Sequence, residues 1–310
     1  MSSLLAYGHR ARAPYLDQTQ IPALEAGILK AQQFGNDWYV NSASNATSNS
    51  GDGSTPASAK TTLAAALALA LSGDRIFIAA GHTETIATAA GIALSQSGVT
   101  IIGLGNGSNR PTFTWSATAS TWTIAGSNNI ISNIRCTSSV DEMVVMFQVT
   151  GSNVVLDRVD HFETTSAQTI AFATFATGTD CVVQNCAHYQ ATAATATQIW
   201  ITATSNTRFK LLNNIFMLAL KDAAAGAVFF GVTSTNILLQ GNVVKMTGGT
   251  TLVSAFLSLN TTTGMVAYNV IGAPVTANTT INDMPGCFSF QNLCTNALDT
   301  SGILDPIADT

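Results

Sequence analysis

The chain has 310 residues and carries 12 Lys and Arg against 17 Asp and Glu, which gives a formal net charge of −5. This mild acidity excludes a protein that binds nucleic acid through one broad basic face. Charged residues make up only 9% of the chain, against about 25% in an ordinary soluble domain. The surface is therefore largely neutral and rich in hydroxyl groups, and such a surface suits a subunit of an assembly because it repels other copies weakly.

No apolar stretch reaches the roughly 18 residues of a membrane-spanning helix, since the best candidate, Leu63 to Leu71, ends at Ser72-Gly73-Asp74. The first residues, MSSLLAYGHR, lack the order of basic start, long apolar stretch and small-residue cleavage site of a secretory signal. We therefore expect synthesis in a cytoplasm and no membrane partner. The five cysteines include no Cys-x-x-Cys pair, which predicts reduced thiols without a disulfide framework or a zinc site.

Residues 1–36 precede the repeats described below and are predicted to form an anchoring arm. The segment is basic near its start, is interrupted by Pro14 and Pro22, and carries spaced apolar residues. A segment of this kind ahead of a rigid domain can become ordered on a partner, and a merely frayed terminus is the alternative. The residues expected to bind the partner are His9, Arg10, Arg12, Tyr15, Leu16, Ile21 and Leu24.

A short helix is predicted near residues 62–72. Leu63, Leu67 and Leu71 are spaced four residues apart, and Gly73 stands where a helix would end. The open end of a stack of strands recruits other chains unless it is covered. We therefore expect this Ala/Leu helix to lie over the first coil.

Short β-rich segments then recur with one pattern: two or three aliphatic residues, two polar residues ending in Asn, then an aliphatic residue. Successive marks lie 25 to 29 residues apart, a period near 27 that fits a parallel β-solenoid with one coil per repeat. Coincidence among the strands of a β-sandwich is the alternative. The marks are Asn106, Asn133, Arg158, Asn185, Asn214, Asn242 and Asn269.

Two columns of apolar residues flank the marks, four positions apart. Residues four apart that both face inward cannot lie on one flat strand, so the chain is expected to bend at the mark. Asn tolerates the left-handed backbone of such a corner, and stacked Asn side chains can bond along the ladder. The columns are Ile130, Val155, Val182, Leu211, Leu239 and Val266 before the mark, and Ile134, Val159, Cys186, Ile215, Val243 and Val270 after it.

The N-terminal segments Trp38–Ser42, Gly51–Pro56, Gly73–Ile78 and Gly81–Ile86, with the Ala/Leu helix, resemble the entry module of right-handed parallel β-helix proteins of the pectate-lyase-like superfamily, especially bacteriophage virion members. The resemblance covers about residues 38–290. It implies an all-β, right-handed stack of coils, often trimeric in phages, over residues 37–290, with residues 291–310 as a C-terminal cap or tail. It implies less about activity, because this scaffold serves lyases, hydrolases, tail spikes and capsid-decorating proteins.

Enzymes of the resembling families bind calcium through clustered carboxylates beside an Arg or Lys base, or use two acids across a groove. The densest acidic cluster in this chain consists of Asp157, Asp160 and Glu163. The repeat places Arg135 beside Asp160 one coil earlier, so the favoured interpretation is an ion pair between coils. A catalytic site formed by the three acids is the alternative.

His161 and His188 share one column, with Cys136 one coil before them and Met217 one coil after. A metal held by the two histidines and Cys136 is conceivable. A partly buried polar stack is the favoured interpretation, so no metal site is predicted. The scattered aromatic residues predict core or subunit contacts in preference to a sugar-binding platform; they are Trp115, Trp122, Trp200 and Tyr189.

These observations together predict a non-enzymatic structural protein of a phage virion that needs no cofactor. We expect a homotrimer on the capsid surface, with its N-terminal arms docked on the major capsid protein of the same virion. A tail spike normally needs a particle-binding domain before its β-helix, for which this chain has no room, so decoration of the head is favoured. The alternative is a short tail spike that binds glycans or cleaves polysaccharide at the acidic cluster.

Overall fold

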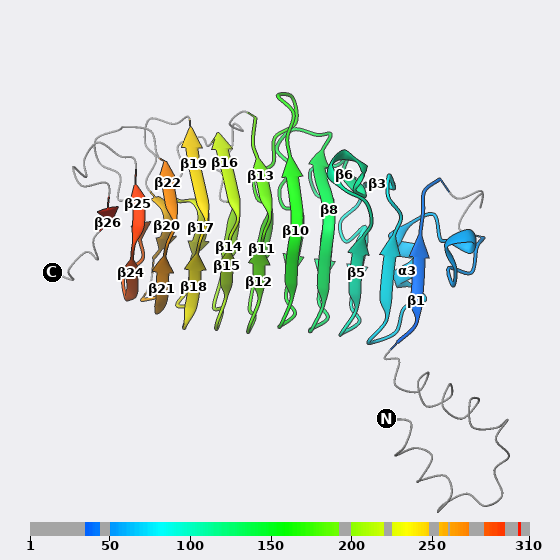
Figure 1. The fold of residues 1–310 in the computed structure, drawn as a ribbon, viewed down its shortest axis with the longest axis horizontal. Coiled ribbons are helices and arrows are strands. Elements are labelled where there is room, and N and C mark those ends of the chain that lie inside the picture. The colour runs from blue at the N-terminus through cyan, green and yellow to red at the C-terminus, as the bar shows by residue number, and fades with distance from the viewer. Residues whose placement is uncertain are drawn as a thin grey trace, which may run out of the picture.

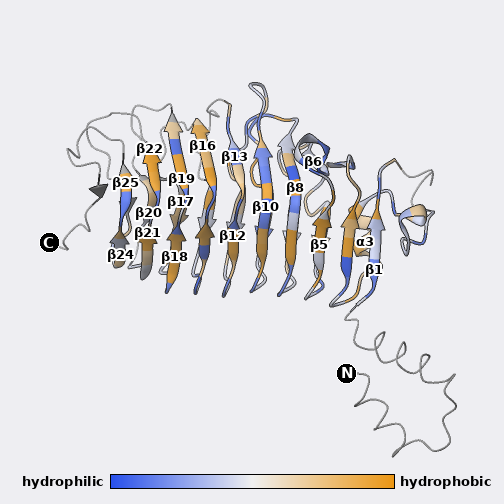
Figure 2. Cartoon of the chain, viewed as in Figure 1, coloured by the Kyte–Doolittle hydropathy of each residue, from blue (hydrophilic) through white to orange (hydrophobic). Residues whose placement is uncertain are grey.

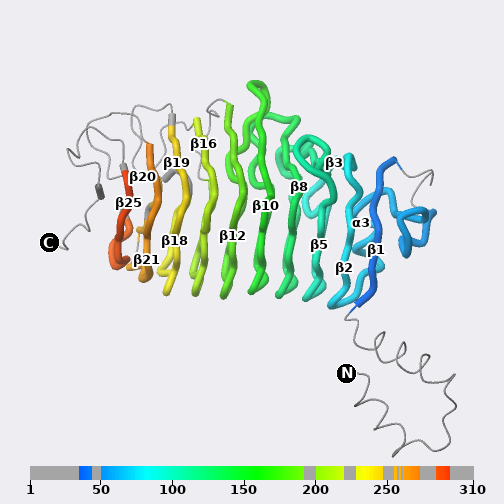
Figure 3. Tube along the Cα trace, in the orientation of Figure 1, coloured from blue at the N-terminus to red at the C-terminus, as the bar shows by residue number. Residues whose placement is uncertain are grey.

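The computed structural model describes residues 35–43, 50–191, 200–219, 225–247, 254–259, 261–272, 282–294 and 303–304. These residues form an elongated stack of β-coils with very little helix (Figure 1). The successive coils lie side by side along the long axis, as the tube in Figure 3 shows. The predicted partner-binding residues of the arm, His9, Arg10, Arg12, Tyr15, Leu16, Ile21 and Leu24, lie outside the described residues.

Each coil contributes strands to three parallel ladders. The first ladder contains β1 (Asp37–Val40), β2 (Arg75–Ile78), β5 (Thr100–Gly103), β8 (Ile130–Ser138), β10 (Val155–Phe162), β12 (Val182–Gln184), β15 (Lys210–Leu212), β18 (Ile237–Gln240), β21 (Gly264–Ala267) and β24 (Cys287–Phe290). The second contains β3 (Thr83–Ile86), β6 (Thr112–Trp115), the far halves of β8 and β10, β13 (Ala187–Tyr189), β16 (Ile215–Ala219), β19 (Val243–Thr247), β22 (Val270–Gly272) and β25 (Asn292–Cys294). The third contains β4 (Ile92–Leu94), β7 (Trp122–Ile124), β9 (Phe147–Val149), β11 (Ala173–Phe175), β14 (Ile201–Ala203), β17 (Ala225–Phe230), β20 (Ser254–Ser258) and β23 (Asn282–Asp283).

Inward-facing side chains of the strands fill the interior of the stack. Side chains at equivalent positions of successive coils form columns along it. One inward column runs through Ile76, Ile101, Ile131, Leu156, Val183, Leu211, Leu239 and Val266, which are paired in register 25 to 30 residues apart. Aromatic rings fill the space between the ladders; Phe147 contacts Trp122 at 5.4 Å and Phe172 at 5.2 Å between ring centroids. The parallel β-helix predicted from the period near 27 is therefore confirmed.

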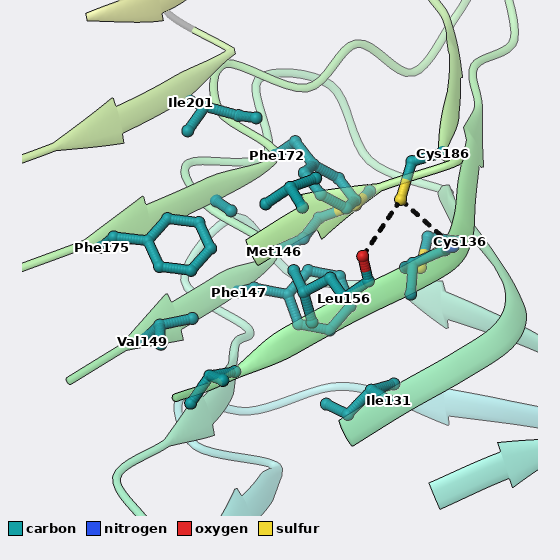
Figure 4. Close-up of a cluster of buried hydrophobic side chains, with 14 of the residues drawn as sticks. Ile131, Cys136, Met146, Phe147, Val149, Leu156, Phe172, Phe175, Cys186 and Ile201 are labelled. Atoms are coloured by element: carbon teal, nitrogen blue, oxygen red, sulfur yellow. Dashed lines mark hydrogen bonds between the residues drawn. The ribbon is translucent and has the colours of Figure 1, made fainter. Parts of the chain in front are cut away.

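The core also holds free thiols. Cys136, Cys181 and Cys186 are buried and Cys287 is half-buried. The Cys186 thiol lies 3.6 Å from the carbonyl oxygen of Leu156 in the neighbouring coil (Figure 4). Burial raises the pKa of Cys136 and Cys186 well above the usual range of a thiol, so these groups stay protonated and pack as small apolar side chains.

From β8 onward, the bend between the first two ladders falls at a residue with left-handed backbone in each coil. The corner residues are Asn133, Arg158, Asn185, Asn213, Gly241, Tyr268 and Gln291, with φ between +48° and +68°. The predicted bend is confirmed at the marks Asn133, Arg158 and Asn185. The mark Asn106 is wrong, because Gly103 takes the corner position and packs against Asn133, while Asn106 precedes the 3₁₀ turn Gly107–Asn109.

The last three marks are also displaced, by one residue. Asn214, Asn242 and Asn269 follow the corner and point inward, where each amide bonds to the next coil. The predicted apolar columns therefore mix two faces. The residues predicted inward that the structure places outward or half-exposed are Ile130, Val155 and Val182 before the corner, and Ile215, Val243 and Val270 after it.

A second left-handed corner precedes the first ladder and was not predicted. It is formed by Asn128, Asn153, Asp180, Arg208 and Asn236, with φ between +55° and +59°. The residue before each is Ser or Thr, and these hydroxyls bond from coil to coil, as in Ser152 N–H to Ser127 Oγ at 3.1 Å. The recurring Ser/Thr–Asn/Asp pair ahead of the aliphatic run is the signal in the sequence that marks this corner.

The first coils are covered by α3 (Leu63–Leu67), which packs against β1 and β4. The side chain of Thr62 caps the helix by accepting from the N–H of Ala65, and Glu84 accepts from the N–H of Leu63 at 2.7 Å. The covering helix is confirmed but is shorter than the predicted 62–72. Leu71 is exposed, and its N–H donates to Asp74 at 2.8 Å instead of continuing the helix.

The far end of the stack is formed by β24 and β25. A short strand, β26 (Ile303–Leu304), pairs antiparallel with β25. Hydropathic colouring shows β16 and β22 as mainly hydrophobic, whereas β8 and β10 carry hydrophilic residues in their middle (Figure 2). Within the described residues, none of the helices is long and apolar enough to cross a membrane.

Candidate functional site

Two residues of the acidic cluster, Asp157 and Asp160, lie on β10, and the corner at Arg158 separates them. Asp157 precedes the corner and is bonded on both of its oxygens. Its Oδ1 accepts from Asn185 Nδ2 at 2.8 Å and from Gln184 Nε2 at 3.2 Å, and its Oδ2 accepts from Arg158 Nε at 2.9 Å. Two of these donors belong to the next coil, so Asp157 ties two coils together.

Asp160 lies beyond the corner and faces outward. Its Cα pairs with that of Arg135, as the repeat predicted. The ion pair, however, is formed with Arg110, in an earlier loop, and both side chains of that pair are largely buried. The second oxygen of Asp160 accepts from the N–H of Ala187 at 2.9 Å. The predicted partner is therefore corrected from Arg135 to Arg110.

Arg135 instead lies over the ring of Phe162, with its guanidinium carbon 4.8 Å from the ring centroid. Phe162 in turn stacks on Tyr189 in the next coil, at 5.0 Å and nearly parallel. A cation held over an aromatic face contributes about 0.5–1 kcal/mol at an exposed site. This chain of contacts gives Arg135 a packing role that the sequence analysis missed.

Glu163 directly follows β10 and turns away from the other two acids. Its side chain is fully buried, and its Oε1 accepts from the N–H of Thr169 at 2.5 Å, while its Oε2 has no partner. Burial raises the pKa of Glu163 to about 8, against the opposing effect of the Thr169 hydrogen bonds. At neutral pH this group is mainly protonated.

The three acids that the sequence grouped are thus separated by their surroundings. A glycosidase needs two carboxyl groups that face one another across the scissile bond, whereas Asp157 and Asp160 are bonded to neighbouring coils and Glu163 is enclosed. A pocket of about 420 Å³ lies at the other end of the described stack, and none of the three acids lines it. Its lining residues are Gly35, Asn36, Asp37, Trp38, Ser54 and Arg75.

The histidine column is confirmed in register. Cys136, His161 and His188 pair in consecutive coils, but Phe216, and not Met217, follows His188. Both imidazoles are fully buried among aromatic rings, with Trp200 at 4.9 Å from His161 and Phe172 at 4.4 Å from His188. Burial lowers the pKa of His161 to about 3 and that of His188 well below its usual value, with His161 adding to the effect.

These histidines are neutral at physiological pH and are surrounded by apolar rings. Across the described part of the chain, no three His, Cys, Asp or Glu side chains are grouped so that they could hold a metal ion. Several polar atoms beside them have no hydrogen-bond partner in the structure. They are Nδ1 of His161, both ring nitrogens of His188, Oε2 of Glu163, and Oε1 and Nε2 of Gln190.

The aromatic residues considered for sugar stacking belong to the core. Trp115, Trp122 and Trp200 are fully buried, which confirms the core assignment and excludes them from an exposed platform. Tyr189 is the exception, since it is about one-third exposed and stacks on Phe162.

The entry module holds a second buried polar group, at the start of the stack. His82 Nδ1 accepts from the N–H of Ser42 at 2.9 Å, so its Nε2 carries the proton that points to Glu84 at 3.1 Å. Glu84 also accepts from the first turn of α3. This relay fixes the covering helix to the second ladder and serves the fold.

A scan against protein-family models finds no match, and a search of curated proteins finds no similar sequence. Among solved structures, a rhamnogalacturonan lyase matches over 77% of this chain and 74% of its own, with 12% identity and a TM-score of 0.51. A GH136 lacto-N-biosidase from Eubacterium ramulus matches over 88% and 70%, with 11% identity and a TM-score of 0.41. Both neighbours are enzymes by name. At 12% identity the likeness to the lyase shows the fold alone, and the ladders of this chain show that it is a parallel β-helix.

Proposed function

We propose that this protein is a non-enzymatic structural subunit of a bacteriophage virion, which decorates the capsid as a homotrimer and docks through its N-terminal arm. The observation that carries the proposal is the use of the acidic cluster: Asp157 and Asp160 hold neighbouring coils together, and Glu163 is enclosed and protonated. The acids that would serve catalysis on this scaffold are therefore occupied in structural contacts.

The outer surface supports the same proposal. Stacked Ser, Thr and Asn side chains bond from coil to coil along one edge of the described stack, as in Asn153 Nδ2 to Asn128 Oδ1 at 2.8 Å. The charged residues of this corner, Asp180 and Arg208, form an ion pair with each other, so the edge carries no net charge. A rigid rod with few charges is suited to a place in a shell of many copies, where repeated weak contacts add up.

Removal of the arm tests the proposal. Particles stripped of this protein are incubated with the full-length chain or with a variant that lacks residues 1–34, and bound protein is measured after sedimentation of the particles. The full-length chain is expected to bind and the variant is expected to remain in the supernatant, with an unchanged circular dichroism spectrum. Binding by the variant at wild-type level would contradict the role of the arm.

The enzymatic alternative has its own test. If the protein cleaves host polysaccharide at the acidic cluster, Asp157→Asn and Asp160→Asn abolish cleavage, and the matched change Asp180→Asn, at a surface pair with Arg208, leaves it intact. The structural proposal predicts that the wild-type chain releases no reducing ends from capsule or lipopolysaccharide of the host. Cleavage that depends on Asp157 and Asp160 would overturn it.

A further inference from the structure

The last coils carry a contiguous apolar surface on their outer face. It is formed by six residues of the last two coils that contribute to the first two ladders, each 38% to 81% exposed; we call it the C-terminal apolar face, and its residues are Met265, Tyr268, Val270, Phe288, Phe290 and Leu293. Val243 and Ile215 extend it by two coils, because they pair in register with Val270 and with each other.

Register and ring contacts join these residues into one surface. Met265 pairs with Phe288, and Val270 pairs with Leu293. Across the corner, the rings of Tyr268 and Phe290 meet edge to face at 5.5 Å. The face is thus built on rigid, hydrogen-bonded strands.

Two of the columns that form the face are polar earlier in the stack, whereas the column of Met265 and Phe288 is already apolar at Ile130, Val155 and Val182. The column of Val270 and Leu293 carries Arg135 and Asp160 in β8 and β10, where both take part in the contacts described above. The column of Phe290 carries Asp157 and Gln184, which are bonded to each other. In these two columns the change from polar to apolar residues distinguishes the C-terminal coils from β8 and β10.

The extent of this surface is at the upper limit of the largest apolar patch of a free monomer, and the extension by Val243 and Ile215 takes it beyond that limit. At roughly 200 Å² for a large apolar side chain, the exposed fractions of the six residues correspond to about 600 Å², and Val243 and Ile215 raise this to about 750 Å². The largest apolar patch of a typical monomer is about 300–600 Å². A stable interface buries about 800 Å² per partner.

The absence of charge identifies the partner. Residues 264–272 and 287–294 contain no Asp, Glu, Lys or Arg, so the six residues of this face offer nothing to a charged partner or to anionic lipid headgroups. Lys245, which pairs with Gly272, is an exposed charge at the border of the face. A second copy of this chain presents the same neutral surface with the same spacing between coils, which is what a symmetric interface requires. We propose that the C-terminal apolar face is the contact surface between copies of this chain.

In a closed ring of parallel copies joined at this face, all stacks run in the same direction. The described chain enters the stack at Gly35, at the end opposite to β24 and β25 (Figure 1). Association at the C-terminal coils therefore leaves the entry ends of all copies on one side. The inference concerns self-association and does not depend on the proposed virion role.

Charge introduced into the face tests it. Sedimentation velocity at micromolar concentration is expected to show an oligomer for the wild-type chain. Val270→Asp with Phe288→Asp is expected to raise the dissociation constant at least a hundredfold, which leaves a monomer near 32.1 kDa, because two carboxylates per copy would be buried without partners. The matched control, Leu71→Asp with Leu104→Asp, changes two exposed leucines outside the face and is expected to remain oligomeric.

Photo-cross-linking provides a second test of the interface, which does not depend on whether the charged variant folds. The photoreactive residue p-benzoylphenylalanine at position 288 retains an aromatic side chain and is expected to yield covalent dimers and trimers, whereas the same residue at position 71 yields none. A monomeric wild-type chain, an oligomer that survives the charged substitutions, or a monomer that floats with neutral lipid vesicles through this face would each overturn the proposal. Loss of particle binding by the arm deletion would not bear on it.

Discussion

Glu163 is a carboxyl group whose ionisation is strongly altered by the fold. Its pKa rises from 4.5 to about 8 because its side chain is buried. A raised pKa in the folded state means that the folded protein holds a proton that the unfolded chain releases. The resulting stability is present below about pH 4.5 and is lost as the pH rises through about 8.

Glu163→Gln is therefore expected to remove a pH dependence. Gln imitates the protonated acid, so the variant should match the wild type at pH 5 and exceed its free energy of unfolding by a few kcal/mol at pH 9. Urea denaturation at the two pH values measures this difference. Parallel loss of stability in both proteins between pH 5 and 9 would show that Glu163 is not the group responsible.

The buried histidines predict the opposite behaviour at low pH. The pKa of His188 falls well below 6.5 in the fold because of burial, so its stability contribution is present above pH 6.5 and is lost as the pH falls. His188→Phe, at a position that stacks on Phe216 at 4.9 Å, is expected to lose less stability between pH 7 and 4 than the wild type. Thermal melts across this range provide the measurement, and identical slopes would contradict the prediction.

Among the elements, the stacked asparagines hold the last coils together. Asn242 donates through Nδ2 to the carbonyl oxygen of Leu211 and to Asn269 Oδ1, both at 2.9 Å. Its Oδ1 accepts from the N–H and Nδ2 of Asn214, both at 3.0 Å. Every polar atom of this buried side chain is thus bonded to a neighbouring coil.

Asn242→Leu is expected to destabilise the protein by about 3–5 kcal/mol, because it leaves several buried polar groups without partners. Asn213→Gly is the matched control: it changes the corner asparagine of the preceding coil, where Gly adopts the left-handed backbone freely, and should cost less than about 1 kcal/mol. Chemical denaturation compares the two variants. A larger loss for Asn213→Gly would reverse the roles assigned to these residues.

The adjacent residues Asn213 and Asn214 show where the sequence analysis succeeded and where it failed. The period near 27, the bend and the covering helix were predictable, because aliphatic spacing and Asn reveal coils directly. The register after Asn185 was not, since Asn213 and Asn214 are adjacent and both the corner and the interior favour Asn. The repeat alone cannot say which of the two turns the chain, and the hydrogen-bonded ladder decides it.

The candidate site was less predictable than the fold. The repeat correctly placed Asp160 beside Arg135, but the ion pair comes from Arg110, 50 residues away in a loop that carries no repeat signal. Glu163 accepts a hydrogen bond from Thr169, which lies in the loop that follows β10. Loops between repeats differ from coil to coil, so periodicity carries no information about what they cover.

On the scale of the whole molecule, the stack has two different ends. The entry end holds α3, the relay from Ser42 through His82 to Glu84, and Asp74, which accepts from Trp38, Asn36 and Leu71. Burial alone would raise the pKa of Asp74, but these hydrogen bonds lower it. The far end presents the C-terminal apolar face. A stack with a covered entry end and an apolar far end suits an oligomer of parallel copies, in which all the entry ends lie on one side.

The proposed role in a virion is tested most directly by a cryo-electron microscopy reconstruction of purified phage particles in which this protein is located by a label. The proposal predicts density repeated over the icosahedral shell, with three coil stacks per site joined at their C-terminal coils. Density only at the tail would contradict the decoration role and favour a spike. Absence of the protein from the particle would contradict the structural role altogether.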